Sequence, residues 1–381
     1  MLNKNVTEYI ENNAKAARDL LLTLAPIPAP SHKEELRAEF CKKWLVDAGA
    51  ENVYIDEALN VVYPVYDDGK RPLKVFMAHS DVVFPDTEPL PLYCRDGRIY
   101  CPGVGDDTAN AVALLTVAKY VATHMPECGE YGVLLVINSC EEGLGNLKGC
   151  RKIMEDYGSR VAEFVTFDGG AQSILSKAVG SHRYRIEIKT KGGHSYGNFG
   201  SPNAIHLMSQ LICRLYSVEV PKRGRTTFNV GVISGGTSVN TIAQNAEMLY
   251  EYRSDNKDDL AEMKGTFEAI IKEFSESCNV QVSLVGDRPC GTAHDEEKQA
   301  DLVRRTVSAV EYGYGITPKQ RSGSTDCNVP LSMGIPSVCV GCINGGGAHT
   351  REEYVEENSI KGGLYVAFSM ILDAFGGTNE Q

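Results

Sequence analysis

The sequence predicts an α/β protein in which a mainly parallel sheet domain is interrupted by an inserted α+β domain. Three observations lead to this fold class. The chain has 381 residues, more than a single hydrophobic core usually holds. Short apolar runs that end in polar residues alternate with helical patterns in its first half. Near residue 180 the pattern changes to alternating apolar and polar residues, and the earlier pattern returns after about residue 295.

The first domain opens with two predicted helices, because apolar residues recur every three or four positions over residues 16–27 and 34–50. A third, longer helix is expected to open at Asp106 or Asp107, after a glycine loop. Four apolar runs are typical of buried parallel strands, and they cover residues 73–83, 131–143, 162–170 and 334–343.

The inserted domain follows the order strand, helix, strand, strand, helix, strand. Its alternating strands are predicted over residues 182–193, 226–236, 247–254 and 279–287. Its amphipathic helices are predicted over residues 203–217 and 259–277. This order is typical of a ferredoxin-like sheet with helices on one face. The domain bounds that follow are 1–179 with 295–381 for the first domain and 180–294 for the insert.

Composition excludes several classes of protein. The formal net charge is −12, so broad binding to nucleic acid or to an anionic membrane is not expected. No window approaches the roughly 18 apolar residues of a membrane span, and the first 20 residues lack the apolar run of a signal peptide. We therefore expect a cytoplasmic protein. The CxxC pair Cys339 and Cys342 lies in an apolar strand, which favours a structural role for both.

Acidic residues and histidines gather at the predicted strand ends of the first domain. They are His79 with Asp81, Asp106 with Asp107, Glu141 with Glu142, Asp168, and His349. Each alone is more often a helix cap or a loop residue. Because the carboxyl ends of parallel strands meet at one edge of a sheet, these groups are expected to face one crevice. There they would repel one another without a cation, and mixed imidazole and carboxylate ligands suit zinc, with cobalt or manganese as alternatives.

The spacing within two of these pairs has its own meaning. A strand places residues 79 and 81 on the same face, so Asp81 can orient the imidazole of His79. Glu141 and Glu142 are neighbours and point apart. One of them can therefore bind a metal while the other acts as a general base on water.

The ordered motifs AHSD, GVGDDTAN, SCEEG, TFDGG, KGGHSYG and GGGAHTREEYV run from residue 77 to about residue 355. Together they resemble the family of co-catalytic zinc hydrolases that includes peptidase T, carboxypeptidase G, aminoacylase and acetylornithine deacetylase. The peptidase T branch looks most similar, because of GDD, EEG and DGG. The resemblance implies two zinc ions per chain in the first domain. It also implies that the insert is a lid or dimerisation domain.

Roles for individual residues follow from the resemblance. His79, Asp106 and Asp168 would hold one zinc, and Asp106, Glu142 and His349 the other, with Asp106 bridging. Asp81 would orient His79, and Glu141 would be the general base. In the insert, His194 would polarise the scissile carbonyl, often from the neighbouring subunit of a homodimer, although the Ser-Tyr-Gly that follows it departs from the usual pattern. Asn240 and Arg253 would bind substrate.

Three functions stay open at this point. The first is a di- or tripeptide aminopeptidase, and the second is a deacylase or carboxypeptidase that acts on N-acyl amino acids. Both share one chemistry and differ in which end of the substrate is held; Arg253 suits a carboxylate in either case. The third is a scaffold or binding protein without activity, which the intact set of acids and histidines speaks against.

Overall fold

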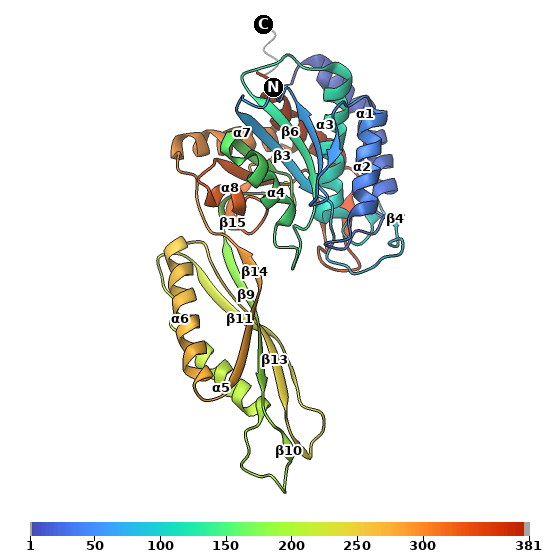
Figure 1. Ribbon diagram of the computed structural model, residues 1–381. Coiled ribbons are helices and arrows are strands. Elements are labelled where there is room, and N and C mark those ends of the chain that lie inside the picture. Colours follow the sequence, from blue (N-terminus) through green and yellow to red (C-terminus); the bar gives the residue numbers. More distant parts are fainter. Residues whose placement is uncertain (1, 377–381) are drawn as a thin grey trace. The chain divides into compact units, whose positions relative to one another are not determined.

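The computed structural model describes residues 2–376, and the chain forms two compact units (Figure 1). Unit 1 contains Met1–Ala178 and Thr292–Gln381, and unit 2 contains Val179–Gly291. Unit 2 begins one residue before, and ends three residues before, the bounds 180–294 that the sequence pattern suggests.

Unit 1 is built on an eight-stranded sheet in the order β1-β2-β6-β3-β7-β16-β8-β15. Its strands are β1 (Tyr54–Ile55), β2 (Val61–Val65), β3 (Leu73–His79), β6 (Gly132–Asn138), β7 (Val161–Thr166), β8 (Ser173–Ala178), β15 (Lys319–Gly323) and β16 (Ser337–Val340). The four central strands β6, β3, β7 and β16 are mutually parallel, and each overlaps one of the four apolar runs in the sequence. Strands β2 and β8 join them antiparallel, whereas β15 is parallel to β8.

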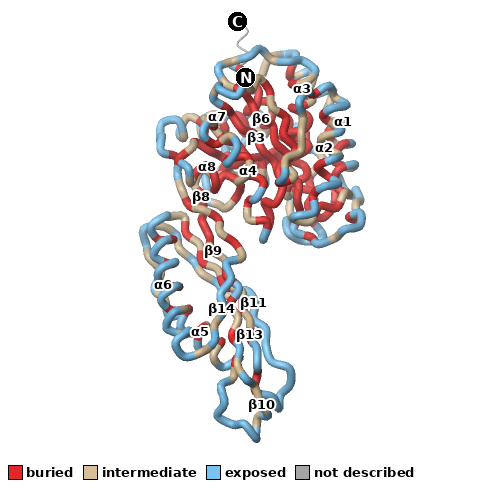
Figure 2. Tube along the Cα trace, in the orientation of Figure 1, coloured by how far each residue is buried: buried red, intermediate tan, exposed pale blue. Residues whose placement is uncertain are grey.

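Helices cover both faces of this sheet, which explains why the central strands are mostly apolar on both faces. They are α1 (Lys4–Leu24), α2 (Glu35–Asp47), α3 (Ala109–His124), α4 (Lys148–Tyr157), α7 (Glu296–Tyr314), α8 (Asn328–Ser332) and α9 (Ser359–Asp373). All seven residues of β3 are buried (Figure 2). Phe76 packs in the core beneath α1, α3 and α9, while its neighbour Val75 packs in the core beneath α4 and α8.

The expected start of the long helix is wrong by two to three residues, because α3 begins at Ala109. The preceding residues form a separate turn, η1 (Val104–Thr108), in which Asp106 has the non-helical angles φ −122° and ψ 85°. A small antiparallel sheet lies in the same unit and consists of β4 (Tyr93–Arg95), β5 (Arg98–Tyr100), β17 (Gly345–Gly346) and β18 (Tyr354–Glu356).

Unit 2 has the ferredoxin-like order that the sequence predicts. An antiparallel sheet in the order β11-β13-β9-β14 carries two helices on one face. The elements are β9 (Gly180–Lys189), α5 (Ala204–Tyr216), β11 (Thr226–Gly235), β13 (Asn245–Ser254), α6 (Lys257–Ser275) and β14 (Asn279–Arg288). Alternate residues such as Tyr184 and Ile186 pack beneath the helices. A further two-stranded sheet pairs β10 (Gly193–His194) with β12 (Thr241–Ile242).

Two further sequence expectations concern membranes and cysteines. Among residues 2–376, none of the helices combines the length and the apolar character that a membrane span requires. Cys339 and Cys342 are both buried and unpaired, and burial raises the pKa of both thiols well above its usual value. A buried thiol of this kind behaves as a small apolar side chain.

Candidate active site

The carboxyl ends of three neighbouring strands bring chemistry-bearing residues to one edge of the unit 1 sheet. His79 is the last residue of β3. Glu141 and Glu142 follow the end of β6, and Asp168 follows the end of β7. Two further groups come from outside these strands: Asp106 lies in the turn η1, and His349 lies between β17 and β18.

These residues form two overlapping clusters around His79. Ligand atoms of His79, Asp106 and Glu142 all lie within 4.8 Å of one another. The same holds for His79, Asp107 and Asp168. The structure therefore brings together the five residues that the sequence singles out as metal ligands, since His349 joins the first cluster through Asp106 and Glu142.

Asp106 lies between the two imidazoles of the cluster. Its Oδ1 is 3.2 Å from Nε2 of His79, and its Oδ2 is 3.1 Å from Nε2 of His349. Nε2 of His349 also lies 3.3 Å from Oε1 of Glu142. Each carboxylate oxygen of Asp106 thus faces a different imidazole, which is the arrangement that a bridging carboxylate needs.

Asp81 contacts the opposite side of the His79 ring. It is fully buried, and its Oδ1 lies 3.4 Å from Nδ1 of His79, whose Nε2 faces Asp106. The Asp81 carboxylate also accepts hydrogen bonds from the backbone N–H groups of Glu141 and Glu142, both at 3.0 Å. One buried carboxylate therefore orients the imidazole and fixes the turn that carries both glutamates.

The Asp107 carboxylate supports the site by accepting two hydrogen bonds. The backbone N–H of His79 donates to its Oδ2 at 3.0 Å, and the side chain of Asn110 donates to its Oδ1 at 2.6 Å. Asp107 does not cap α3; its carboxylate supports the end of β3 instead.

The electrostatics of the cluster fit a bound cation. Burial raises the pKa of Asp168 to about 7, and the nearby Asp106 carboxylate adds to this shift. Burial also raises the pKa of Asp107 well above its usual value. Hydrogen bonds that the Asp106 and Glu142 carboxylates accept from His349 raise the pKa of its imidazole to about 10. Carboxylates packed this closely repel one another, and positive charge relieves that repulsion.

The surroundings of the Glu142 carboxylate also fit a bound cation. Its Oε1 is buried, and one ring nitrogen, Nε2 of His349, faces both this oxygen at 3.3 Å and the Asp106 carboxylate at 3.1 Å. Mixed imidazole and carboxylate ligands suit zinc, so the residues present fit a divalent metal of this type.

Three buried residues that the sequence analysis did not identify hold the loops of this site. Arg37 is 1% exposed and donates to the backbone oxygens of Ala25, Ile27 and Ser80 and to the hydroxyl of Thr108. Glu34 accepts a hydrogen bond from the backbone N–H of Cys140 at 3.0 Å. Glu353 accepts three from the turn that carries Asp106.

The sequence carries a faint signal for Arg37. It stands four and eight residues before Cys41 and Leu45, which are both buried, so it occupies the apolar stripe of α2. A charged residue in such a stripe needs buried partners. Glu353 follows His349 by four residues, a spacing that says nothing of its partners.

His194 belongs to unit 2, where its turn fixes the ring. The backbone N–H groups of Tyr196 and Gly197 lie 3.2 and 3.3 Å from its Nδ1 and donate to it. A ring nitrogen that accepts these bonds carries no proton, so in the neutral imidazole Nε2 is the donor. Asn240 lies close to His194: the backbone N–H of Ser195 donates to the backbone carbonyl oxygen of Asn240 at 2.9 Å.

Arg253 lies elsewhere in unit 2 and already has a carboxylate partner. Its Nε and Nη2 donate to the two oxygens of Glu251 at 2.9 and 3.0 Å. It pairs across the sheet with Ser181, at the start of β9. The structure thus brings His194 and Asn240 together and does not bring Arg253 to them.

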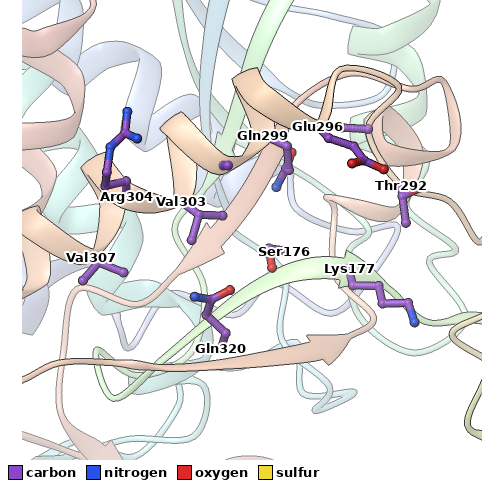
Figure 3. Close-up of a pocket in the computed structure, with 11 residues that line it drawn as sticks. Ser176, Lys177, Thr292, Glu296, Gln299, Val303, Arg304, Val307 and Gln320 are labelled. Carbon is purple, nitrogen blue, oxygen red and sulfur yellow. The ribbon is translucent and has the colours of Figure 1, made fainter.

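Of two cavities in unit 1, the smaller is lined by a residue of the acid and histidine cluster. A cavity of about 630 Å³ lies between α7 and the strands β8 and β15 (Figure 3). Gln299 faces it, but both ends of its amide are bonded to the backbone of Ser337. A smaller cavity of about 130 Å³ is lined by Asp106, Ala348 and several glycines. The smaller cavity belongs to the site, since it opens beside Asp106.

Comparison with known proteins agrees with this geometry. Residues 75–373 match the peptidase family M20/M25/M40. The chain is 26% identical over 332 residues to an acetylornithine deacetylase of Myxococcus xanthus, covering 82% of each chain. It is 28% identical over 244 residues to an N-acetyldiaminopimelate deacetylase of Halalkalibacterium halodurans, covering 58% of this chain and 63% of that one.

Solved structures share the fold at low sequence identity. A tripeptidase of Staphylococcus aureus superposes with a TM-score of 0.75 at 21% identity, covering 96% of this chain and 99% of that one. The aminopeptidase PepT of Bacillus cereus gives a TM-score of 0.71 at 21% identity, covering 95% and 99%. The family match spans most of the sequence and includes every acid and histidine of the cluster. The chain belongs to peptidase family M20/M25/M40 and is a hydrolase of this metallopeptidase and amidohydrolase family.

Proposed function

We propose that this protein is an aminopeptidase that hydrolyses the amide bond of di- and tripeptides with two zinc ions per chain. The observation that supports it most is the position of Asp106, whose two carboxylate oxygens face the imidazoles of His79 and His349 separately. A single carboxylate between two imidazoles suits two cations that share one ligand. Cobalt or manganese would suit the same ligands.

The ligands divide into two sets around that bridge. His79, Asp106 and Asp168 would hold one zinc, and Asp106, Glu142 and His349 the other. When bound, the two cations polarise the scissile carbonyl and acidify the attacking water. Asp81 keeps Nδ1 of His79 occupied, so that Nε2 stays directed at the site.

Glu141 would be the general base. It follows β6 within the turn whose backbone is held by Asp81, and it is 5% exposed. Its carboxylate takes a proton from the attacking water and passes it to the leaving amine. His194 donates from Nε2 to the carbonyl oxygen as negative charge develops there. Asn240 would contact the substrate beside His194, and Arg253 would bind a substrate carboxylate.

A second candidate function is deacylation of N-acyl amino acids. It is favoured by the two sequence relatives described above, which are both named as deacetylases. Deacylation and peptide hydrolysis use the same water, base and metals, and they differ only in whether the substrate has a free amino group. We also propose that the protein acts in the cytoplasm as a homodimer.

One experiment separates these functions. Metal content and hydrolysis are measured on one preparation, before and after chelation and again after zinc or cobalt is restored. The panel contains tripeptides, the same tripeptides acetylated at the amino terminus, and N-acetyl amino acids. Zinc-dependent cleavage of the free peptides alone supports the aminopeptidase. Cleavage of the acetylated compounds instead supports the deacylase, and the absence of both metal and turnover contradicts the proposed function.

A further inference from the structure

Glu353 is a buried carboxylate that binds backbone and is not among the proposed metal ligands. Only 2% of the residue is exposed. Its Oε1 accepts hydrogen bonds from the backbone N–H groups of Gly105 at 2.7 Å and Asp106 at 2.8 Å. Its Oε2 accepts from the N–H of Gly103 at 3.1 Å. Both oxygens therefore contact the turn that carries Asp106.

The turn is shaped to receive an anion. Successive backbone N–H groups that point into one concavity form a binding site for negative charge, and here the Glu353 carboxylate fills it. Gly103 adopts φ 74°, and a Cβ atom at this position would lie 2.2 Å from Cγ1 of Val82. The backbone path is thus fixed by packing on one side and by Glu353 on the other.

Glu353 also belongs to the segment that supplies His349. These two residues are four positions apart, and both contact Asp106: His349 contacts its side chain, and Glu353 accepts from its backbone N–H. The backbone carbonyl oxygen of Glu353 accepts a further hydrogen bond, at 3.2 Å, from the backbone N–H of Cys101, three residues before the turn begins. A movement of this segment would shift both contacts to Asp106 together.

We propose that Glu353 is a positioning residue that sets the orientation of the Asp106 carboxylate and thereby the affinity of the site for metal. The inference rests on the proposed metal site. If the three N–H groups lost their acceptor, they would seek other partners, and the turn would rotate Asp106 away from the two imidazoles. Groups that hold a metal ligand in place typically affect metal affinity by about 10- to 100-fold.

Glu353→Gln tests this with little change of shape. The amide keeps one oxygen, but it places an N–H₂ group against at least one backbone N–H of the turn. Glu352→Gln is the matched control, because the neighbouring side chain is exposed and contacts Tyr93. Zinc is titrated into each chelator-treated protein by calorimetry, and the absorption bands of bound cobalt report the geometry of its ligands. Circular dichroism at the same temperature confirms that each variant is folded.

We expect Glu353→Gln to bind zinc about 10- to 100-fold more weakly than the wild type, with altered cobalt bands, while Glu352→Gln matches the wild type. Equal zinc affinity and equal cobalt bands in folded Glu353→Gln and wild type would overturn the inference and leave the proposed function intact. A wild type that binds no zinc would overturn both.

Gly105→Ala provides a second variant if Glu353→Gln does not fold. It leaves the carboxylate in place and adds a Cβ atom 3.3 Å from Oε1 of Glu353, so it crowds the same contact. Weaker zinc binding in this folded variant supports the inference, and unchanged binding contradicts it.

Discussion

Arg253 lies at one end of the four-stranded sheet of unit 2, whereas His194 lies beyond the other end, in the two-stranded sheet of β10 and β12. His194 follows β9 and pairs with Thr241, whereas Arg253 pairs with Ser181 at the beginning of β9. Eight strand positions separate Ser181 from Lys189, which corresponds to about 27 Å. An extended tripeptide spans only about 10 Å. An extended tripeptide therefore spans less than half of the distance between these two ends of β9.

Mixing two inactive variants tests whether a second copy supplies His194. We expect Glu141→Ala and His194→Ala to be inactive alone and to regain up to about a quarter of wild-type turnover when they are co-expressed as random dimers. The reason is that a mixed dimer contains one site with an intact base and an intact histidine. Turnover is measured on the co-purified proteins. If mixed dimers form and remain inactive, His194 does not act from a second copy.

Replacing the proposed base should remove turnover without removing metal. We expect Glu141→Ala to lower kcat by about 100-fold to 10,000-fold, because no other group is assigned to take the proton of the attacking water. Its zinc content should match that of the wild type, since Glu142 is the proposed ligand. Glu155→Ala, on the exposed side of α4, is the control and should keep full activity. Turnover of Glu141→Ala near the wild-type value would contradict the assignment.

Arg37 should matter for stability. Its guanidinium donates to three backbone oxygens and one hydroxyl, so Arg37→Leu leaves several buried acceptors without donors. We expect this variant to lower the free energy of unfolding by at least about 3 kcal/mol. Urea unfolding followed by circular dichroism measures the loss. Glu39→Ala, an exposed change on the same helix, should stay within about 0.5 kcal/mol of the wild type.

The ion pair between Asp67 and Arg160 predicts a dependence of stability on pH. A hydrogen bond from Arg160, at 2.7 Å, is the main cause that lowers the pKa of Asp67 below its usual value. A carboxyl whose pKa is lower in the folded state stabilises the protein above its unfolded pKa of about 3.9 and loses that contribution as the pH falls through the folded value.

We therefore expect Asp67→Asn to be less stable than the wild type at pH 7 by about 1 kcal/mol, with the difference shrinking below about pH 4. Urea midpoints at pH 7 and at pH 3 measure it. A difference between the two proteins that is the same at both pH values would show that the ion pair does not cause it.

The sequence by itself determined the fold class and most of the candidate site. The apolar runs that become β3, β6 and β7 carry acidic residues or a histidine at the carboxyl end, so His79 and Asp168 could be placed at one sheet edge from local pattern alone. Strand alternation likewise predicted that Asp81 would lie beside His79, and the contact between their side chains agrees with it. These features depend on residues that are close together in the chain.

Only the tertiary structure decided which groups hold those residues in place. Glu353 contacts Gly103, which is 250 positions away in the sequence. Arg37 contacts Ser80 and Thr108 from α2, a helix whose sequence pattern does not indicate these partners. The separation of His194 from Arg253 likewise follows from the register of β9 with β13, which no local pattern specifies. The spacing of apolar residues indicates which face of a helix or strand is buried, because that spacing involves only residues within the same element. The partner of a buried polar group depends on how distant elements pack, so it can be read only from the folded protein.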